Sequence, residues 1–132
     1  MLFVTLIANA KKTNASYWNK VIDAISQVES KGSPSAVSKD CVGILQIRPV
    51  LVNDVNEYLK MKKSSKRFKL NDRLSAEKSK EMFVLYQERY NPTSSVERAI
   101  KIWNGGPYYD KSQTNKVNEY YRKVMKYYNG GK

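Results

Sequence analysis

The sequence predicts one mainly α-helical domain. Its 132 residues fit a single domain and leave no room for a second. Apolar residues recur at helical spacing in successive segments, and short polar turns separate these segments. No stretch shows the alternation of apolar and polar residues that is typical of a strand. Because 41% of the residues are hydrophobic, the chain can bury an ordinary core.

The first 14 residues are either an N-terminal extension or part of a first helix. Met1–Ala10 is apolar and ends in Ala-Asn-Ala, which is similar to a signal-peptide cleavage site. The segment lacks a basic n-region, and its apolar stretch is short for a signal peptide. A degenerate signal segment, a helix and a strand therefore all stay open for residues 1–14, and the folded domain is expected over residues 15–132.

The first core helix is predicted over Tyr17–Ser30. Asn14 or Ser16 can cap its start, and Gly32 with Pro34 ends it. Its buried face is predicted from apolar residues at helical spacing, which are Trp18, Val21, Ile22, Ile25 and Val28.

Four further helices are predicted from their start signals and apolar faces. The second begins at Pro49, a favoured first-turn residue, and the third follows the cap Ser75. The fourth begins at the capping-box pattern Ser94–Glu97 and ends at Asn104–Pro107, and a fifth lies near the C-terminus. The predicted inner faces, in order, are Leu51, Val55, Tyr58 and Leu59; Met82, Phe83, Tyr86 and Tyr90; Val96, Ala99, Ile100 and Trp103; and Val117, Tyr120, Tyr121, Val124 and Tyr128.

The composition excludes several kinds of site. The chain has no His, so it can form neither a Ser-His-Asp triad nor an imidazole metal site. A single cysteine, Cys41, excludes an internal disulfide and a multi-thiolate zinc site. No apolar run approaches the ~20 residues of a membrane span. Catalysis must therefore rest on carboxylates, hydroxyls, Lys, Arg or Tyr, and no metal is expected.

The charge indicates polyanionic partners without selecting one. The 24 Lys and Arg residues against 12 Asp and Glu give a net charge of +12. Nucleic acid, anionic lipid and bacterial cell wall would all attract such a surface, but no nucleic-acid-binding motif is present. The most basic run, Lys60–Lys69, is interpreted as a solvated, mobile loop in preference to a dedicated binding patch.

One carboxylate lies where a charge is unexpected. On a helical wheel, Glu29 falls within the apolar stripe of the first core helix, in its last turn. Burial and the negative end of the helix dipole both disfavour its charged form, so the side chain is a candidate general acid. The alternative is a Glu whose tip bends back into solvent, as long charged side chains often do.

The next two segments contain a polar turn and a short apolar stretch. The turn is Gly32–Ser38, and the stretch is Gly43–Ile47 with a single amide, Gln46. Gly43 permits a close approach of backbone. Because an amide can both donate and accept, Gln46 either recognises a sugar or is satisfied by backbone at the edge of the core.

These residues carry a resemblance to a known family. The pattern E-S-x-G-x-P-x-A-x-S over Glu29–Ser38, followed by G-I-L-Q-I over Gly43–Ile47, resembles the signature of soluble lytic transglycosylase (SLT) domains. These domains belong to the lysozyme-like superfamily and cut peptidoglycan. Ala99–Pro107 resembles the family's A-x-x-A-Y-N-A-G-P block, and Tyr120–Tyr128 resembles its closing helix. The matching blocks follow the family's order over nearly the whole chain.

The chain departs from the family pattern in three places. The stretch between Ser38 and Gly43 is one residue shorter than in the family, and Leu45 replaces a Met. Trp103 stands where the family has a Tyr whose hydroxyl helps to hold the catalytic acid. An indole N–H can donate but cannot accept. Tyr120 either supplies the missing hydroxyl or is a plain core aromatic.

The resemblance implies a compact, lysozyme-like helical domain with a substrate cleft. It implies cleavage of the β-1,4 bond between N-acetylmuramic acid and N-acetylglucosamine, with Glu29 as the single acid and base and a 1,6-anhydro product. It further implies a monomer that acts outside the cytoplasm, in a phage or bacterial setting, on peptidoglycan and not on nucleic acid, without cofactor. The substrate-binding residues it implies are Ser30, Ser38, Gln46, Trp103, Asn104, Tyr108 or its neighbour Tyr109, and Tyr120.

Two other functions stay open. A hydrolytic muramidase would usually need a second carboxylate across the bond. The candidates are Asp40, Asp54, Asp72 and Asp110, of which Asp40 lies in the loop between the two signature blocks. A non-catalytic basic module that binds cell wall or nucleic acid is the other alternative.

Overall fold

The computed structural model describes the backbone of residues 2–131 and the side chains of residues 16–131. The elements in that range are α1 (Leu2–Ser30), β1 (Val37–Ser38), β2 (Cys41–Val42), α2 (Pro49–Met61), the 3-10 helix η1 (Leu70–Leu74), α3 (Ala76–Tyr90), α4 (Val96–Gly105), the 3-10 helix η2 (Lys111–Gln113) and α5 (Thr114–Tyr128). The predicted mainly α fold is confirmed.

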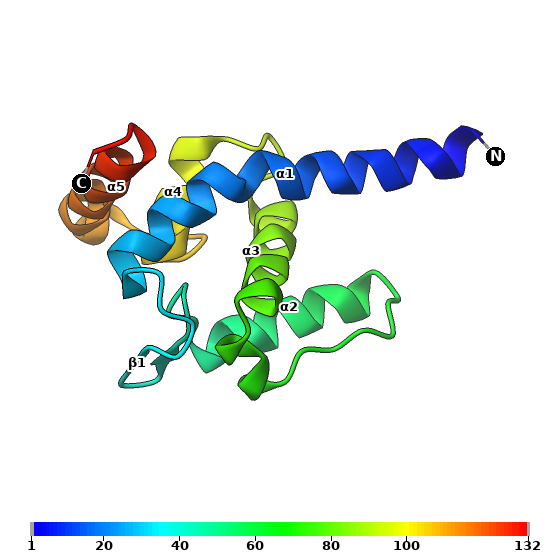
Figure 1. Cartoon of the computed structure of the whole chain (residues 1–132), viewed down its shortest axis with the longest axis horizontal. Helices are drawn as coiled ribbons and strands as arrows, with labels where there is room; N and C mark the ends of the chain where they lie inside the picture. The colour runs from blue at the N-terminus through cyan, green and yellow to red at the C-terminus, as the bar shows by residue number, and fades with distance from the viewer. Residues whose placement is uncertain (1, 132) are drawn as a thin grey trace.

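Helices α3, α4 and α5 contact α1, and α2 lies beyond α3 (Figure 1). Helices α4 and α5 pack against the C-terminal half of α1 and against each other, while α3 crosses beneath α1 and contacts α2 on its other side. The hairpin of β1 and β2 lies below the C-terminal end of α1 (Figure 1). One apolar core joins all five helices, and residues such as Ile25, Phe83 and Ile100 are fully buried in it. This core holds the end of α1 in place.

Helix α1 is longer than the sequence predicts. It begins at Leu2 and passes Asn14 and Ser16 without a break, so the predicted start near Tyr17 is wrong. No glycine or proline interrupts the segment, so nothing in it breaks the helix. A capping residue stabilises the start of a helix but does not by itself create one. The side chains of residues 1–15 lie outside the described residues, so the signal segment suggested there stays a prediction.

The ends of the other helices follow the local signals closely. Pro49 begins α2, and the Ser75 Oγ accepts the backbone N–H of Lys78 at 3.1 Å at the start of α3. The N-cap of α4 is Ser95, not Ser94. Asn91 explains the shift, because its Oδ1 accepts the Ser95 N–H at 3.1 Å and aligns that residue as the cap.

The predicted inner faces are largely confirmed. Residues at the centre of each face are buried, among them Val55, Met82, Ala99 and Val124. The face of α2 is rotated slightly, because Val52 is buried whereas Leu51 and Tyr58 are only half-buried. Tyr90, Tyr121 and Tyr128 also lie at the edge of the core, not inside it.

The hairpin of β1 and β2 was not predicted, because strands of two residues are too short to show a period. Val37 pairs with Val42 and Ser38 with Cys41 in antiparallel register. Lys39 adopts a φ of 58° in the two-residue turn. The stretch between Ser38 and Gly43, which is one residue shorter than in the family, therefore contains a tight turn.

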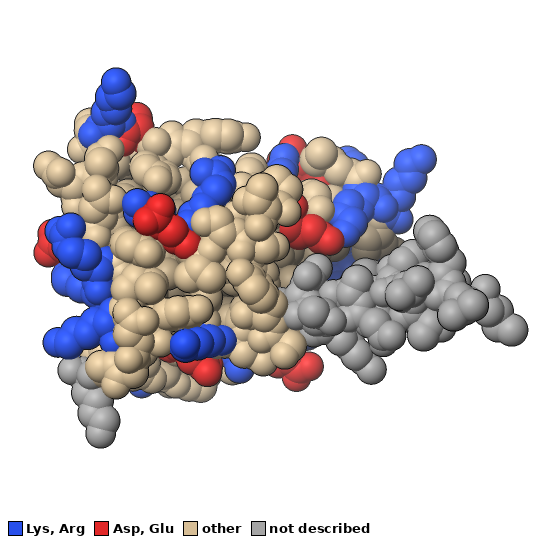
Figure 2. All heavy atoms as spheres, turned by 90° about the horizontal axis from the view of Figure 1, so that it is seen from above, with Lys and Arg blue, Asp and Glu red and all other residues tan. Residues whose placement is uncertain are grey.

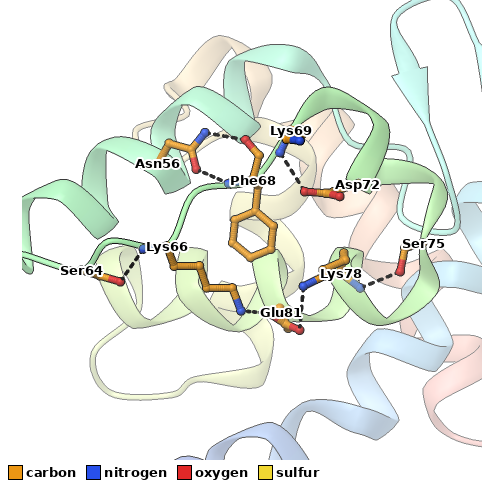
Figure 3. Close-up of polar contacts among 9 residues, drawn as sticks. All are labelled: Asn56, Ser64, Lys66, Phe68, Lys69, Asp72, Ser75, Lys78 and Glu81. Atoms are coloured by element: carbon orange, nitrogen blue, oxygen red, sulfur yellow. Dashed lines mark hydrogen bonds and ion pairs between the residues drawn. The ribbon is translucent and has the colours of Figure 1, made fainter.

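The basic segment Lys60–Lys69 is anchored to the domain (Figure 3). Phe68 inserts its ring into the core and is only 4% exposed. The Asn56 side chain donates to the Phe68 carbonyl oxygen at 2.9 Å and accepts its N–H at 2.7 Å. Lys66 pairs with Glu81 of α3. The segment is solvated, as predicted, because most of its residues are exposed. It is not a free loop, however, because an apolar anchor and two backbone hydrogen bonds hold it at Phe68.

Replacing Asn56 by Ala tests this anchor. We expect the free energy of unfolding to fall by about 2 kcal/mol, since both backbone groups of Phe68 lose their partner in a half-buried place. Asn53 lies exposed on the same helix, so Asn53→Ala is the matched control and should change stability little. Urea denaturation of both variants provides the measurement, and equal effects would contradict the anchor.

The surface carries its charge unevenly. Figure 2 shows Lys and Arg side chains gathered at both ends of one face, with a mostly uncharged middle between them. Within the described part of the chain, none of the helices is both long and apolar enough to cross a membrane.

Candidate active site

Glu29 lies in the last turn of α1, half-buried. Tyr120 reaches it from α5, and the Tyr120 hydroxyl donates to Glu29 Oε2 at 3.2 Å. The Tyr120 side chain is only 8% exposed. Its ring therefore belongs to the core while its hydroxyl bonds to the carboxylate, so packing in the core is not the only contact of this residue.

Burial dominates the electrostatics of Glu29. It raises the pKa of the carboxyl from 4.5 to about 7, although the Tyr120 hydrogen bond and the positive charge of Arg48 both lower that pKa. The Tyr120 hydroxyl responds in turn, because burial and the nearby carboxylate raise its pKa well above its ordinary value. Glu29 is thus divided between its acid and base forms near neutral pH, as a group needs to be if it both gives and takes a proton.

Arg48 is the residue that sequence reasoning missed. It is exposed, immediately before α2, and its charge acts on Glu29. A backbone bridge between Val42 and Ile47 places Arg48 across from Cys41, at the base of the hairpin. In a chain with 24 Lys and Arg residues, no local signal distinguishes this arginine.

Two of the predicted substrate-binding residues hold backbone in place. The Ser30 hydroxyl lies 2.8 Å from the carbonyl oxygen of Ile44, to which it donates. Trp103 donates its Nε1–H to the carbonyl oxygen of Leu45 at 3.2 Å, and its ring packs on Phe83. Together they fasten the Gly43–Ile47 segment between the ends of α1 and α4, beside Glu29. The Trp103 N–H bonds to backbone, whereas the hydroxyl that bonds to Glu29 belongs to Tyr120.

Gln46 is satisfied by backbone. Its Nε2 donates to the carbonyl oxygens of Ala36 at 3.1 Å and Gly43 at 3.0 Å. Its own backbone has a φ of 50°. Of the two roles open for this amide, the structural one accounts for both of its N–H groups.

The remaining predicted residues differ in exposure. Asn104 follows Trp103 in α4, and its buried Oδ1 has no hydrogen-bond partner among the described residues. Ser38 on β1 is exposed, and Tyr108 is 84% exposed with a ring contact to Tyr90. Tyr109 is half-buried against Gly105. None of the described contacts links Ser38, Tyr108 or Asn104 to Glu29.

Three of the four candidate second carboxylates have structural partners. Asp54 accepts from Arg89 at 2.8 Å and from the Tyr90 hydroxyl at 2.6 Å. Asp72 and Asp110 cap the two 3-10 helices. Asp40 lies exposed in the turn of the hairpin, and its carboxylate has only the Cys41 thiol, at 3.8 Å, as a hydrogen-bond partner among the described side chains. No group of three or more Asp, Glu or Cys that could hold a metal ion occurs among the residues whose side chains are described.

Replacing Tyr120 by Phe is expected to raise the pKa of Glu29 above 7. The hydroxyl stabilises the carboxylate form, so its removal leaves burial less opposed. A carbon-13 NMR titration of the Glu29 carboxyl measures this pKa directly. Tyr121→Phe, which changes the adjacent half-buried tyrosine of α5, is the control and should leave the titration in place. An unchanged or lowered pKa in Tyr120→Phe would contradict the assignment of this contact.

Comparison with known proteins agrees with this geometry. The family model described as "Transglycosylase SLT domain" matches residues 6–132, which is almost the whole chain. No curated protein and no solved structure matches the chain. The family match covers the Glu29, Gly43 and Trp103 segments, which the structure brings together around one half-buried carboxyl. The chain therefore belongs to the transglycosylase SLT domain family, within the lysozyme-like superfamily.

Proposed function

We propose that this chain is a lytic transglycosylase that cleaves the β-1,4 bond between N-acetylmuramic acid and N-acetylglucosamine in peptidoglycan. Membership of the SLT family indicates a transglycosylase-type function on peptidoglycan. The observation that carries the finer proposal is Glu29, a half-buried carboxyl with a pKa of about 7 that accepts a hydrogen bond from Tyr120. A single carboxyl suffices here because the substrate supplies the nucleophile.

The reaction needs two proton transfers through Glu29. As the bond between C1 and the glycosidic oxygen breaks, the carboxylic acid gives its proton to that oxygen. The resulting carboxylate then takes the proton of the muramic acid C6 hydroxyl while that oxygen bonds to C1 and closes the 1,6-anhydro ring. Glu29 ends protonated and no water is consumed. The Tyr120 hydroxyl and the Arg48 charge stabilise the carboxylate between the two transfers.

Other residues have supporting roles in this proposal. Ser30, Gln46 and Trp103 position the Gly43–Ile47 backbone next to the acid. The unpartnered Oδ1 of Asn104 can accept the N–H of a substrate acetamido group. Ser38 and Tyr108, both exposed, are proposed to contact the glycan at the edges of the cleft.

Product analysis separates this reaction from hydrolysis. Asp54 is held in an ion pair, and Asp72 and Asp110 cap 3-10 helices. A muramidase would therefore have to use the exposed Asp40 as its second carboxylate. We expect mass spectrometry of digested sacculi to show 1,6-anhydro ends, which are lighter than reducing ends by one water. A digest that contains only reducing ends would assign the chain to the hydrolases.

The setting follows from the substrate. Because peptidoglycan lies outside the cytoplasm, we propose that the chain acts there, as a monomer, in a phage or a bacterial wall-remodelling context. The net charge of +12 favours approach to walls rich in carboxylates or phosphates. A wild-type protein that bound sacculi or DNA without releasing soluble fragments would instead support the non-catalytic alternative.

A further inference from the structure

A cavity of about 820 Å³ lies away from Glu29, between α1, α3 and the anchored basic segment. Apolar side chains from three elements line it, among them Ile22 of α1, Leu59 of α2 and Leu85 of α3. Lys66 and Glu81, whose ion pair is drawn in Figure 3, belong to its lining as well. None of the residues assigned to the active site lines this cavity.

The cavity contains an unpartnered buried donor. Gln87 of α3 is 1% exposed and lines the cavity. Its Oε1 accepts from Asn91 Nδ2 at 3.1 Å, but its Nε2 has no hydrogen-bond partner among the described residues. Leaving a buried N–H unpaired is costly, and native proteins rarely do so unless a water or a ligand supplies the acceptor. The position therefore favours a guest that carries a carbonyl oxygen.

The charges of the cavity balance. Its described lining contains the three lysines Lys62, Lys66 and Lys80 and the three glutamates Glu77, Glu81 and Glu88, so their sum is zero. Two of each are paired with one another, Lys62 with Glu88 at 3.0 Å and Lys66 with Glu81. Although the chain as a whole is strongly basic, this site offers many hydrogen-bond donors and acceptors and has no net charge. Such a site suits a neutral polar ligand better than a polyanion.

We propose that this cavity is a second glycan-binding site that takes a short oligosaccharide of N-acetylated hexosamine. The acetamido carbonyl oxygen accepts from Gln87 Nε2, and the acetamido methyl group lies against the half-buried Val84 and Leu85. Sugar hydroxyls bond to the charged side chains at the mouth. One N-acetylhexosamine unit supplies all three features, and a volume of about 820 Å³ lies in the range of sites for drug-sized ligands. The biological role, holding a glycan strand beside the reacting one, rests on the proposed function.

Titration with tri-N-acetylchitotriose tests the site. We expect saturable NMR shifts of the Gln87 side-chain amide and the Trp18 indole, both of which belong to lining residues. Gln87→Met keeps a similar volume but removes the donor, and it should weaken binding at this site by about tenfold. Val84→Trp fills the cavity and should abolish the shifts, so the test does not depend on one variant folding. Lys123→Met, exposed on α5, is the control.

The outcomes separate this inference from the proposed function. Neither variant touches Glu29, so cleavage of a short soluble glycan fragment and the shifts around Glu29 should stay as in the wild type. An absence of shifts at Gln87 and Trp18, or shifts that survive both variants, would overturn the second site and leave the catalytic proposal intact. A response to neutral tri-alanine but not to the sugar would likewise overturn it in favour of a peptide ligand. Loss of the catalytic role of Glu29 would leave the sugar titration unaffected.

Discussion

Replacing Glu29 by Gln should reduce the release of muropeptides from sacculi by about a thousandfold, the typical contribution of a positioned acid and base. Glutamine has the same shape and can still accept the Tyr120 hydrogen bond, but it can neither give nor regain a proton. Glu119→Gln, an exposed glutamate on α5, is the matched control and should keep full activity. Activity of the Glu29 variant within tenfold of the wild type would refute the mechanism.

We expect the Glu29→Gln variant to remain folded, so that unfolding does not cause the loss of activity. The pKa of Glu29 is about 7 in the folded protein and 4.5 as its ordinary value, so the folded state binds the proton more tightly. The stability of the wild type that comes from this proton is complete below pH 4.5 and is lost as the pH rises to about 7. Above pH 7 the variant should therefore be more stable, by roughly 3 kcal/mol at most, and less if water reaches the half-buried carboxyl. Urea denaturation at pH 4 and pH 8 measures the difference.

Replacing Gly43 by Ala should destabilise the fold by about 4 kcal/mol or more, which places it among the most damaging single substitutions. Gly43 has a φ of 90°, and a Cβ there would lie 1.8 Å from the carbonyl oxygen of Arg73. That oxygen is backbone at the end of η1, so it cannot swing away as a side chain would. Because the Gly43–Ile47 segment lies beside Glu29, activity should fall together with the melting temperature.

Gly106→Ala separates backbone strain from collision. Gly106 has a φ of 85°, nearly that of Gly43, but a Cβ there meets nothing within 4 Å. This control should cost about 1 kcal/mol, the strain of a left-handed residue alone. Thermal melts of the two variants provide the comparison. If both lost the same stability, the close approach of Gly43 to Arg73 would not be what requires a glycine.

Much of the fold could be predicted because it depends on local chemistry. Helical spacing of apolar residues located the buried faces, and Pro49 and Ser75 marked helix starts that the structure confirms. Local signals failed where a distant or neighbouring group competed with them. Asn14 does not cap a helix start because it lies inside α1, which runs without a break from Leu2 to Ser30. Ser95 caps α4 in place of Ser94 because its backbone N–H donates to the Asn91 side chain.

The candidate acid could be suspected from its own helix, but only the family-like blocks that follow it favoured a buried acid over a glutamate whose tip bends back into solvent. Glu29 lies on the apolar stripe of α1, and that position is consistent with burial and a raised pKa. Its partners could not be found in this way. Tyr120 lies 91 residues further along the chain, and only the packing of α5 against α1 brings its hydroxyl to the carboxylate.

The sequence thus determined the buried faces of the helices, the glycine at the close approach and the position of Glu29 on an apolar stripe, because each depends on spacing or backbone conformation within a few residues. The roles of Ser30, Gln46 and Trp103 were decided by the folded chain, since their polar groups bond to backbone carbonyl groups that belong to other segments. The same is true of Arg48, whose charge matters only because the hairpin and the start of α2 bring it near Glu29. Hydrogen bonds and charge interactions depend on distances through space, and those distances exist only once the core has formed.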